Sequence, residues 1–238
     1  MNFSNPGALI EQSIRESELE QFLAAAGLSG TMLDLGCGAK PYYAIYSGYF
    51  EKCIGADLAD SPFPKKDIDI HCSATNVPLP DNSLDFILCT EVLHDIAEPD
   101  AFFNELRRLL KPGGKVFLSS PFVVPIVDGV FDHYRYTEHG LRYRIDKADL
   151  RTLDIKPVGD VVASCITLAI KPSLKIFSSI AKALRLPAFY SVYNPLLFLF
   201  TTLPQLAYLL SRKTPILKTV LARFQYGAIG YISILQKK

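Results

Sequence analysis

The sequence has no aspartate or glutamate after residue 160, although the chain carries 24 acidic residues in all. Ten of its 25 lysines and arginines lie in that acid-free part, so the first 160 residues hold 15 basic and 24 acidic side chains. The formal net charge of +1 therefore conceals an acidic part and a basic part, which we expect to face different partners. Because the basic part is mostly apolar and no nucleic-acid-binding motif occurs, we expect no nucleic-acid partner.

The chain also lacks paired cysteines. Its five cysteines are widely spaced and form no Cys-x-x-Cys motif, which argues against a disulfide framework and against a zinc site. No His, Asp and Glu cluster occurs at ligand spacing, so we expect no metal. The first 22 residues lack a basic stretch before an apolar core, so we expect no secretory signal; Asn5 and Pro6 instead predict a capped helix start. Together these absences favour a reducing, cytoplasmic location.

Short apolar runs alternate with helical patterns over the first 160 residues. The run at 83–90 is continuously apolar, which is typical of a strand buried on both faces of a parallel sheet. A helix is predicted at about 98–110, stopped by Lys111–Gly114. The alternation predicts an α/β fold with a doubly wound, mostly parallel sheet that binds ligands at the carboxyl ends of its strands. The predicted strands lie at about 31–35, 52–58, 67–72, 83–90 and 115–122.

The stretch MLDLGCGAKPYY (32–43) places Asp34, Gly36 and Gly38 at alternate positions behind an apolar run. Glycines this close behind a strand let the backbone approach a ligand. The dinucleotide-binding fingerprint needs a third glycine where this chain has Pro41, which offers no N–H to a phosphate. With the negative charge of Asp34 nearby, the loop predicts a nucleoside ligand without phosphates.

Region 29–160 resembles the class I S-adenosylmethionine-dependent methyltransferases, specifically their small bacterial type 11-like group. The resemblance rests on LDLGCGAKPY, IGADL, CSATNVPLPDNSLDFILCTEVLHDI and ELRRLLKPGGKVFLSSPF, in that order. It implies a Rossmann-like fold, with S-adenosylmethionine as methyl donor and S-adenosylhomocysteine as product. It places Asp34 near the cofactor's ammonium group and Asp57 on both ribose hydroxyls. The implied cofactor-binding residues are Asp34, Gly36, Gly38, Asp57, Leu58, Ser73, Ala74 and Cys89.

Three positions in this region leave alternatives open. Ser73 stands where the family usually has an acid that bonds the adenine amino group, and a hydroxyl accepts this bond more weakly. Cys89 is expected beside the bound methionine, although a small buried filler explains it at least as well. Lys40 is unusual at its place in the glycine loop.

The segment DHYRYTEHGL (132–141) follows the last of these strands, at the mouth where an acceptor must enter. His133 is the best-placed catalytic base, since an unperturbed imidazole titrates near neutrality. Alternatively, the tyrosines pack the loop and Arg135 pairs with a carboxylate such as Asp132. The candidate acceptor-binding residues are Tyr134, Arg135 and Tyr136.

Two further residues, Thr137 and His94, are expected to be structural. Thr137 predicts the N-cap of a helix that carries Glu138 in its first turn. His94 follows the strand at 83–90, and in the family a histidine here often belongs to a helix start and to the packing of the sheet.

No charged residue occurs between Arg185 and Arg212, and this run is apolar enough to suggest a membrane span. Three prolines interrupt it, whereas a span needs about 20 mostly apolar residues in one helix. We favour helices that lie in a membrane interface, where each Lys or Arg near an anionic surface contributes roughly 1 kcal/mol. A lid over the sheet or a dimerisation surface is the alternative. The predicted domains are a cofactor-binding core (1–160), an apolar, basic helical insertion (161–225) and a final strand that returns to the core sheet (226–238).

The sequence thus predicts methyl transfer to an oxygen or nitrogen of a small acceptor, either lipid-like or lipid-linked. The protein is expected to be a cytoplasmic monomer or homodimer, peripheral on the inner face of an anionic membrane. Because the donor is already activated, the reaction needs mainly positioning and desolvation. The rival interpretation is a catalytically inactive, membrane-associated binding protein that retains the fold.

Overall fold

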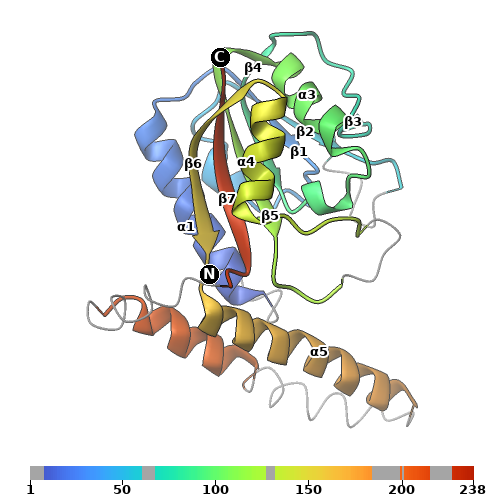
Figure 1. Ribbon diagram of the computed structural model, residues 1–238, viewed down its shortest axis with the longest axis vertical. Helices are drawn as coiled ribbons and strands as arrows, with labels where there is room; N and C mark the ends of the chain where they lie inside the picture. Colours follow the sequence, from blue (N-terminus) through green and yellow to red (C-terminus); the bar gives the residue numbers. More distant parts are fainter. Residues whose placement is uncertain (1–7, 61–67, 127–131, 184–198, 200, 215–226) are drawn as a thin grey trace. The chain divides into compact units, whose positions relative to one another are not determined.

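The computed structural model describes residues 8–60, 68–126, 132–183, 199, 201–214 and 227–238 (Figure 1). The chain forms two compact units. The core unit comprises residues 15–122, 127–156 and 231–238, and the helical unit comprises residues 1–14, 123–126 and 157–230. The division near residue 160 lies close to the predicted one, but the first residues of the chain group with the helical insertion instead of the core.

Seven strands form one sheet in the order β3-β2-β1-β4-β5-β7-β6. β1 pairs in parallel with β2 and β4, β2 with β3, and β4 with β5. The strand order reverses at β1, so a crevice is expected outside the carboxyl ends of β1 and β4, where such sheets bind ligands. The strands are β1 (Thr31–Leu35), β2 (Lys52–Asp57), β3 (Ile70–His71), β4 (Leu84–Thr90), β5 (Leu110–Pro121), β6 (Leu150–Val158) and β7 (Gly230–Lys237).

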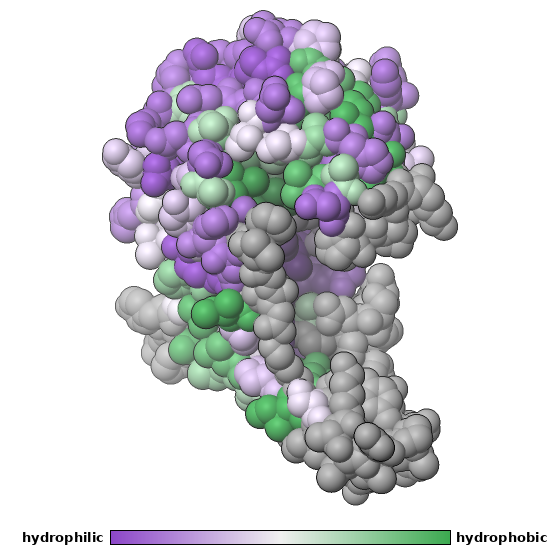
Figure 2. All heavy atoms as spheres, turned by 90° about the vertical axis from the view of Figure 1, so that its right-hand side faces the viewer, coloured by the Kyte–Doolittle hydropathy of each residue, from purple (hydrophilic) through white to green (hydrophobic). Residues whose placement is uncertain are grey.

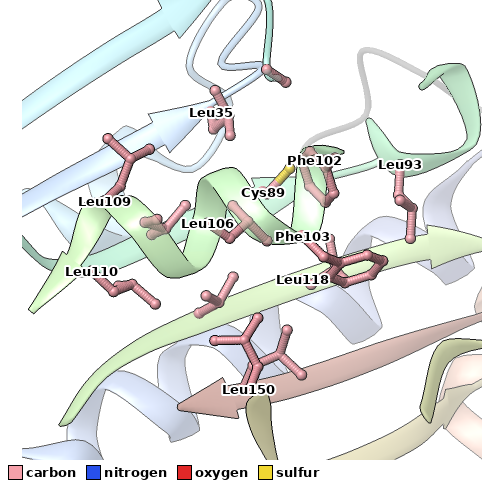
Figure 3. Packing of buried hydrophobic residues seen from close by; sticks show 14 of the residues in the cluster. Leu35, Cys89, Leu93, Phe102, Phe103, Leu106, Leu109, Leu110, Leu118 and Leu150 are labelled. Atoms are coloured by element: carbon pink, nitrogen blue, oxygen red, sulfur yellow. The ribbon is translucent and has the colours of Figure 1, made fainter. Parts of the chain in front are cut away.

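Helices cover both faces of the core sheet. On one face, α3 (Pro99–Leu109) and α4 (Glu138–Lys147) pack on strand residues such as Cys89 and Leu118 (Figure 3). On the other, α1 (Leu9–Ala26) places the ring of Phe22 5.8 Å from Phe86 and 6.1 Å from Phe117. Because both faces are covered, β4 is apolar on both sides except for Asp85, which pairs with Lys111 at 2.8 Å, and for Thr90 at its end.

Most of the predicted core elements are confirmed. β1, β2, β4 and α3 lie where the apolar runs and the helical spacing predict them, and the helical insertion lies between β6 and β7. The hydroxyl of Thr137 accepts the N–H of Gly140 at 3.1 Å, which confirms the N-cap of α4. The Rossmann-like, mostly parallel α/β fold is therefore confirmed.

Other predicted boundaries need correction. β5 begins at Leu110, so Lys111–Gly114 form part of the strand and not only a helix stop. β3 is shorter than the predicted strand at 67–72, and β6 was not predicted. The final strand starts at Gly230, and Asn5 and Pro6 lie outside the described residues.

In the helical unit, α5 (Val161–Ala183) is followed by a helix at 201–211. Asp160 caps α5, because its Oδ1 accepts the N–H groups of Val162 at 3.0 Å and Ala163 at 3.1 Å. Its other oxygen accepts the hydroxyl of Tyr208 at 2.8 Å, which ties the two helices together. Within the predicted insertion at 161–225, the structure describes these two helices, and none of the described helices is long and apolar enough to cross a membrane.

Candidate active site

The loop after β1 adopts a conformation that requires glycine. Gly36 and Gly38 have φ angles of +74° and +49°, in the left-handed region that side chains disfavour. A Cβ on Gly36 would lie 2.1 Å from Cγ2 of Val92. The N–H of Gly36 donates to the carbonyl of Ala56 at 2.7 Å, so the loop lies across the end of β2.

Asp57 ends β2 and fastens the glycine loop. Its Oδ2 accepts the N–H of Gly38, and its Oδ1 accepts the N–H of Leu58, each at 2.7 Å. Each carboxylate oxygen keeps a further lone pair, since an ionised carboxylate has about four acceptor sites. Asp57 is thus fixed by two backbone donors and retains the capacity to accept two hydroxyl groups.

Asp34 is the buried acid of the site. Its side chain lies at the end of β1, and its Oδ2 accepts the hydroxyl of Tyr46, in α2 (Tyr43–Tyr46), at 2.9 Å. Burial raises the pKa of Asp34 to about 7, although Tyr46 and Lys40 oppose the rise. A cation bound beside this carboxylate would relieve the cost of its burial.

Lys40 has a structural explanation. Its Nζ lies 2.9 Å from Oδ2 of Asp69, and the same oxygen accepts the N–H of Gly55 at 2.7 Å. The Lys40 chain covers Gly55 so closely that a Cβ there would lie 2.2 Å from Cε of the lysine. Lys40, which is unusual in the sequence, therefore packs over Gly55 of β2 and pairs with Asp69.

A network around Arg15 and Glu91 was not predicted. Nε of Arg15 donates to the hydroxyl of Tyr42 at 3.1 Å, and a terminal nitrogen lies 3.4 Å from Oε1 of Glu91. The hydroxyl of Ser119 donates to the same oxygen at 2.9 Å, and Glu91 has a φ of +57°. The network joins α1, the glycine loop and the carboxyl ends of β4 and β5. One arginine in a helix gives no sequence signal for partners this far away along the chain.

Three implied cofactor positions occupy different environments. The Ser73 hydroxyl lies 2.8 Å from the Thr75 hydroxyl and accepts the N–H of Thr75 at 3.2 Å, so a local turn already uses it. Ala74 is buried against the main cluster. Cys89 is fully buried among α3 side chains (Figure 3), and burial raises the pKa of its thiol well above the ordinary value. This surrounding supports the interpretation of Cys89 as a packing residue.

The segment after β5 lies against the end of β4. The N–H groups of His133 and Tyr134 donate to the carbonyl of His94 at 2.9 and 3.2 Å. The imidazole of His133 is exposed, and its ring centroid lies 6.1 Å from that of Tyr134. The guanidinium of Arg135 binds both oxygens of Asp132, one of them at 2.7 Å. The expected pairing of Arg135 with Asp132 is thus observed.

The two tyrosines of this segment differ. The hydroxyl of Tyr134 donates to the carbonyl of Ala97 at 3.2 Å, while its ring remains exposed. Tyr136 is buried in the main cluster, which raises the pKa of its hydroxyl to about 12. The ring of Tyr134 therefore reaches solvent, whereas Tyr136 mainly packs.

His94 is buried at a helix start, as expected from the sequence. It lies in η2 (Leu93–Asp95), and its Nε2 is 3.3 Å from Oδ1 of Asp95. Its Nδ1 is buried and has no hydrogen-bond partner among the described residues. Burial raises the pKa of Asp95, and the neighbouring Asp132 adds to the rise. The described residues hold no group of three or more His, Cys, Asp and Glu suited to a metal ion.

Comparison with known proteins agrees with this geometry. Residues 33–118 match the family model described as a methyltransferase domain. A putative sarcosine dimethylglycine methyltransferase from Galdieria sulphuraria shares the fold, with a TM-score of 0.58 and 16% identity over 95% of this chain and 84% of that one. This part of the chain is therefore similar to a methyltransferase domain. Methyltransferases of this fold use S-adenosylmethionine as methyl donor: phosphoethanolamine N-methyltransferase 2 of Haemonchus contortus, solved in complex with S-adenosyl-L-methionine, has a TM-score of 0.53 and 15% identity over 94% of this chain and 52% of that one.

Two curated proteins resemble the same region. Thiol S-methyltransferase TMT1B of Rattus norvegicus is 30% identical over 99 residues, which are 37% of this chain and 41% of that protein. The ubiquinone/menaquinone biosynthesis C-methyltransferase UbiE of Cupriavidus necator is 30% identical over 99 residues, which are 33% of this chain and 41% of that protein. The chain spans half or less of the length of these curated relatives.

The residues at the site fit the cofactor of this class. S-adenosylmethionine carries an ammonium group, ribose hydroxyls and no phosphate. Asp34 offers a buried carboxylate to a cation, and Asp57 offers acceptor sites to two hydroxyls. The left-handed glycines leave the loop backbone free of side chains where the ligand would pass.

Proposed function

We propose that this protein transfers the methyl group of S-adenosylmethionine to an oxygen or nitrogen of a small, lipid-like or lipid-linked acceptor. The observation that carries the proposal is the buried carboxylate of Asp34, which lies near the end of β1, directly before the loop with Gly36 and Gly38. The bound cofactor supplies an activated methyl group, which leaves sulfur with the bonding electrons remaining there, so that S-adenosylhomocysteine is released.

The chain's own residues bind and orient the cofactor, and one of them accepts a proton from the acceptor. Asp34 holds the ammonium group, and Asp57 holds the ribose through the oxygens that Gly38 and Leu58 already fix. His133 accepts the proton that an oxygen or nitrogen acceptor must lose. Its exposed imidazole suits this role, since general-base assistance needs access to the acceptor.

The proposed acceptor class has two supports. The part of the chain after residue 160 is apolar and free of acids, which favours a lipid-like molecule or a lipid surface nearby. The similar UbiE protein is named for quinone biosynthesis, and the similar TMT1B protein for a thiol acceptor. These two relatives are named for different acceptor atoms, sulfur and carbon. The proposed acceptor atom, oxygen or nitrogen, therefore rests on the proposed base His133 alone.

An inactive binding protein with the same fold is the second candidate. The observation in its favour is Ser73, whose hydroxyl is already engaged with Thr75 where an acid would bond the adenine. Titration calorimetry with S-adenosylmethionine separates the candidates. An enzyme should bind it with a dissociation constant in the micromolar range, whereas the inactive protein should give no binding heat. Incubating a lipid extract with methyl-labelled cofactor then identifies the acceptor by the labelled product. Binding without any labelled product would favour the inactive protein.

A further inference from the structure

The helical unit exposes large aliphatic side chains. Among the described residues on its helices, six such side chains are solvent-exposed, and their exposed fractions reach 58% for Ile176 and 62% for Leu210. Figure 2 shows large hydrophobic areas on the face of this unit that it presents. The six are Val162, Leu168, Ile176, Leu199, Leu203 and Leu210.

On the helix at 201–211, the exposed leucines form one stripe. Leu203 and Leu210 are seven residues apart, and Leu199 is helical as well and lies four residues before Leu203. Such spacings put side chains on the same helix face. The opposite face is buried, with Thr201, Gln205 and Tyr208 turned inward.

On α5, the exposed residues also share one side. At 100° per residue, Val162, Leu168 and Ile176 fall within an arc of about 120°, opposite the buried Ala163 and Ile170. The cluster that the buried side forms includes Ile10, Tyr208 and Ile229. Both helices therefore have a packed face and an apolar face without a partner in the described part of the chain.

The same unit shows no exposed acid among its described residues. Glu11 and Asp160 are its only described carboxylates, and both are buried. Lys171 lies 2.8 Å from Glu11, and Asp160 is used by the start of α5 and by Tyr208. At the end of the leucine stripe, Arg212 and Lys213 add positive charge.

We propose that the apolar faces of α5 and of the helix at 201–211 dock on an anionic phospholipid surface. The exposed aliphatic side chains enter the interface, and Lys213 with its neighbours meets the lipid phosphates. A second copy of the chain fits less well, because two acid-free, basic surfaces would repel each other. This inference concerns the helical unit alone and holds whatever acceptor the core unit methylates.

The test is co-flotation of the full chain with vesicles of phosphatidylcholine alone or mixed with phosphatidylglycerol, at low and at high salt. We expect binding to the anionic vesicles only, weakened by salt because counterions screen exposed charges. Replacing Leu203 and Leu210 by Gln should lower the affinity at least about tenfold. Lys213→Gln should lower it about fivefold.

Matched controls lie in the core unit, where Leu153→Gln and Lys52→Gln change exposed residues of the same types. Neither control should change vesicle binding, and all variants should keep the thermal transition and the cofactor heat of the wild type. Equal binding to neutral vesicles, or an equal loss in the controls, would overturn the proposal. If the wild type is a dimer without lipid, and the double variant Leu203→Gln, Leu210→Gln is a monomer, the apolar faces form a self-association surface instead. Binding that resists both salt and alkaline extraction would show insertion across the bilayer.

Discussion

The two units expose different kinds of large hydrophobic side chain. Among the described residues, those exposed in the core unit are mainly tyrosines, whose hydroxyls tolerate water, whereas those exposed in the helical unit are all aliphatic. The core unit also carries exposed acids, such as Asp60, but the helical unit buries both of its described acids. The core surface therefore suits solvent and the helical surface suits an apolar, anionic partner. The exposed tyrosines are Tyr43, Tyr49, Tyr134 and Tyr143.

The units also use buried carboxylates differently. Asp160 in the helical unit is satisfied by two backbone N–H groups and a tyrosine, so it serves packing. Asp34 in the core unit is buried beside one tyrosine hydroxyl, and its pKa of about 7 records an unrelieved cost. This difference agrees with the proposals that the core unit binds the cofactor and that the helical unit attaches to a lipid surface. Variants in one unit should leave the property of the other intact.

The largest effect is expected from Gly36→Val. The new side chain would collide with Val92 and force a valine into left-handed backbone, so cofactor binding should be lost. Gly48→Ala is the control, because a Cβ there meets nothing within 4 Å. Calorimetry measures the loss, and vesicle flotation should be unchanged for both variants. A folded Gly36→Val protein with wild-type affinity would refute the role of the loop.

His133→Ala should lower turnover by about 10²–10⁴-fold, the usual range for a general base, while cofactor affinity stays within about twofold of wild type. His139→Ala, an exposed histidine on α4, is the control. Single-turnover kinetics with labelled cofactor give the comparison. A decrease of less than about threefold would make His133 a packing residue, because positioning alone then suffices.

Asp57→Ala should weaken cofactor binding by about 2–4 kcal/mol, since two hydrogen bonds to a charged acceptor are removed. The change also frees the N–H of Gly38 and loosens the loop. Asp60→Ala, an exposed acid three residues later, should leave the affinity unchanged. If both variants bind S-adenosylmethionine equally, the assignment of the ribose contact is wrong.

Asp34→Asn should stabilise the fold while it weakens cofactor binding. Because the folded pKa of about 7 lies above the ordinary 3.8, the folded state loses stability as pH rises between these values, and the loss is complete above about 7. Asparagine removes this loss, so the variant should gain about 4 kcal/mol at pH 8 and little near pH 4. Urea unfolding at both pH values measures the gain. No gain at pH 8 would show that Asp34 is ionised without cost.

The core strands were predictable because apolar runs bounded by glycine and aspartate mark buried parallel strands. β1 matches its run residue for residue, and β4 begins one residue inside its run. β6 was missed because it is an edge strand whose alternating side chains are mostly exposed, so it carries no apolar run. β6 is held in the sheet by pairing with β7, which is formed by the last residues of the sequence.

The site was predictable only where its residues share one local segment. Asp34 lies in β1 and Gly36 and Gly38 lie in the loop after it, so one short stretch of sequence contains all three. Arg15 and Glu91 were missed because their contact depends on how α1 packs on the sheet. The engagement of Ser73 with Thr75 likewise depends on a local turn geometry that residue type does not specify.

The most direct test of the account is calorimetric titration of the full chain with S-adenosylmethionine, with Asp57→Ala as the paired variant. We expect one site per chain with a dissociation constant in the micromolar range, weakened by at least about 30-fold in the variant. Absence of binding heat in the folded wild type, or equal binding by the variant, would contradict the claim that the core unit is a working methyltransferase site.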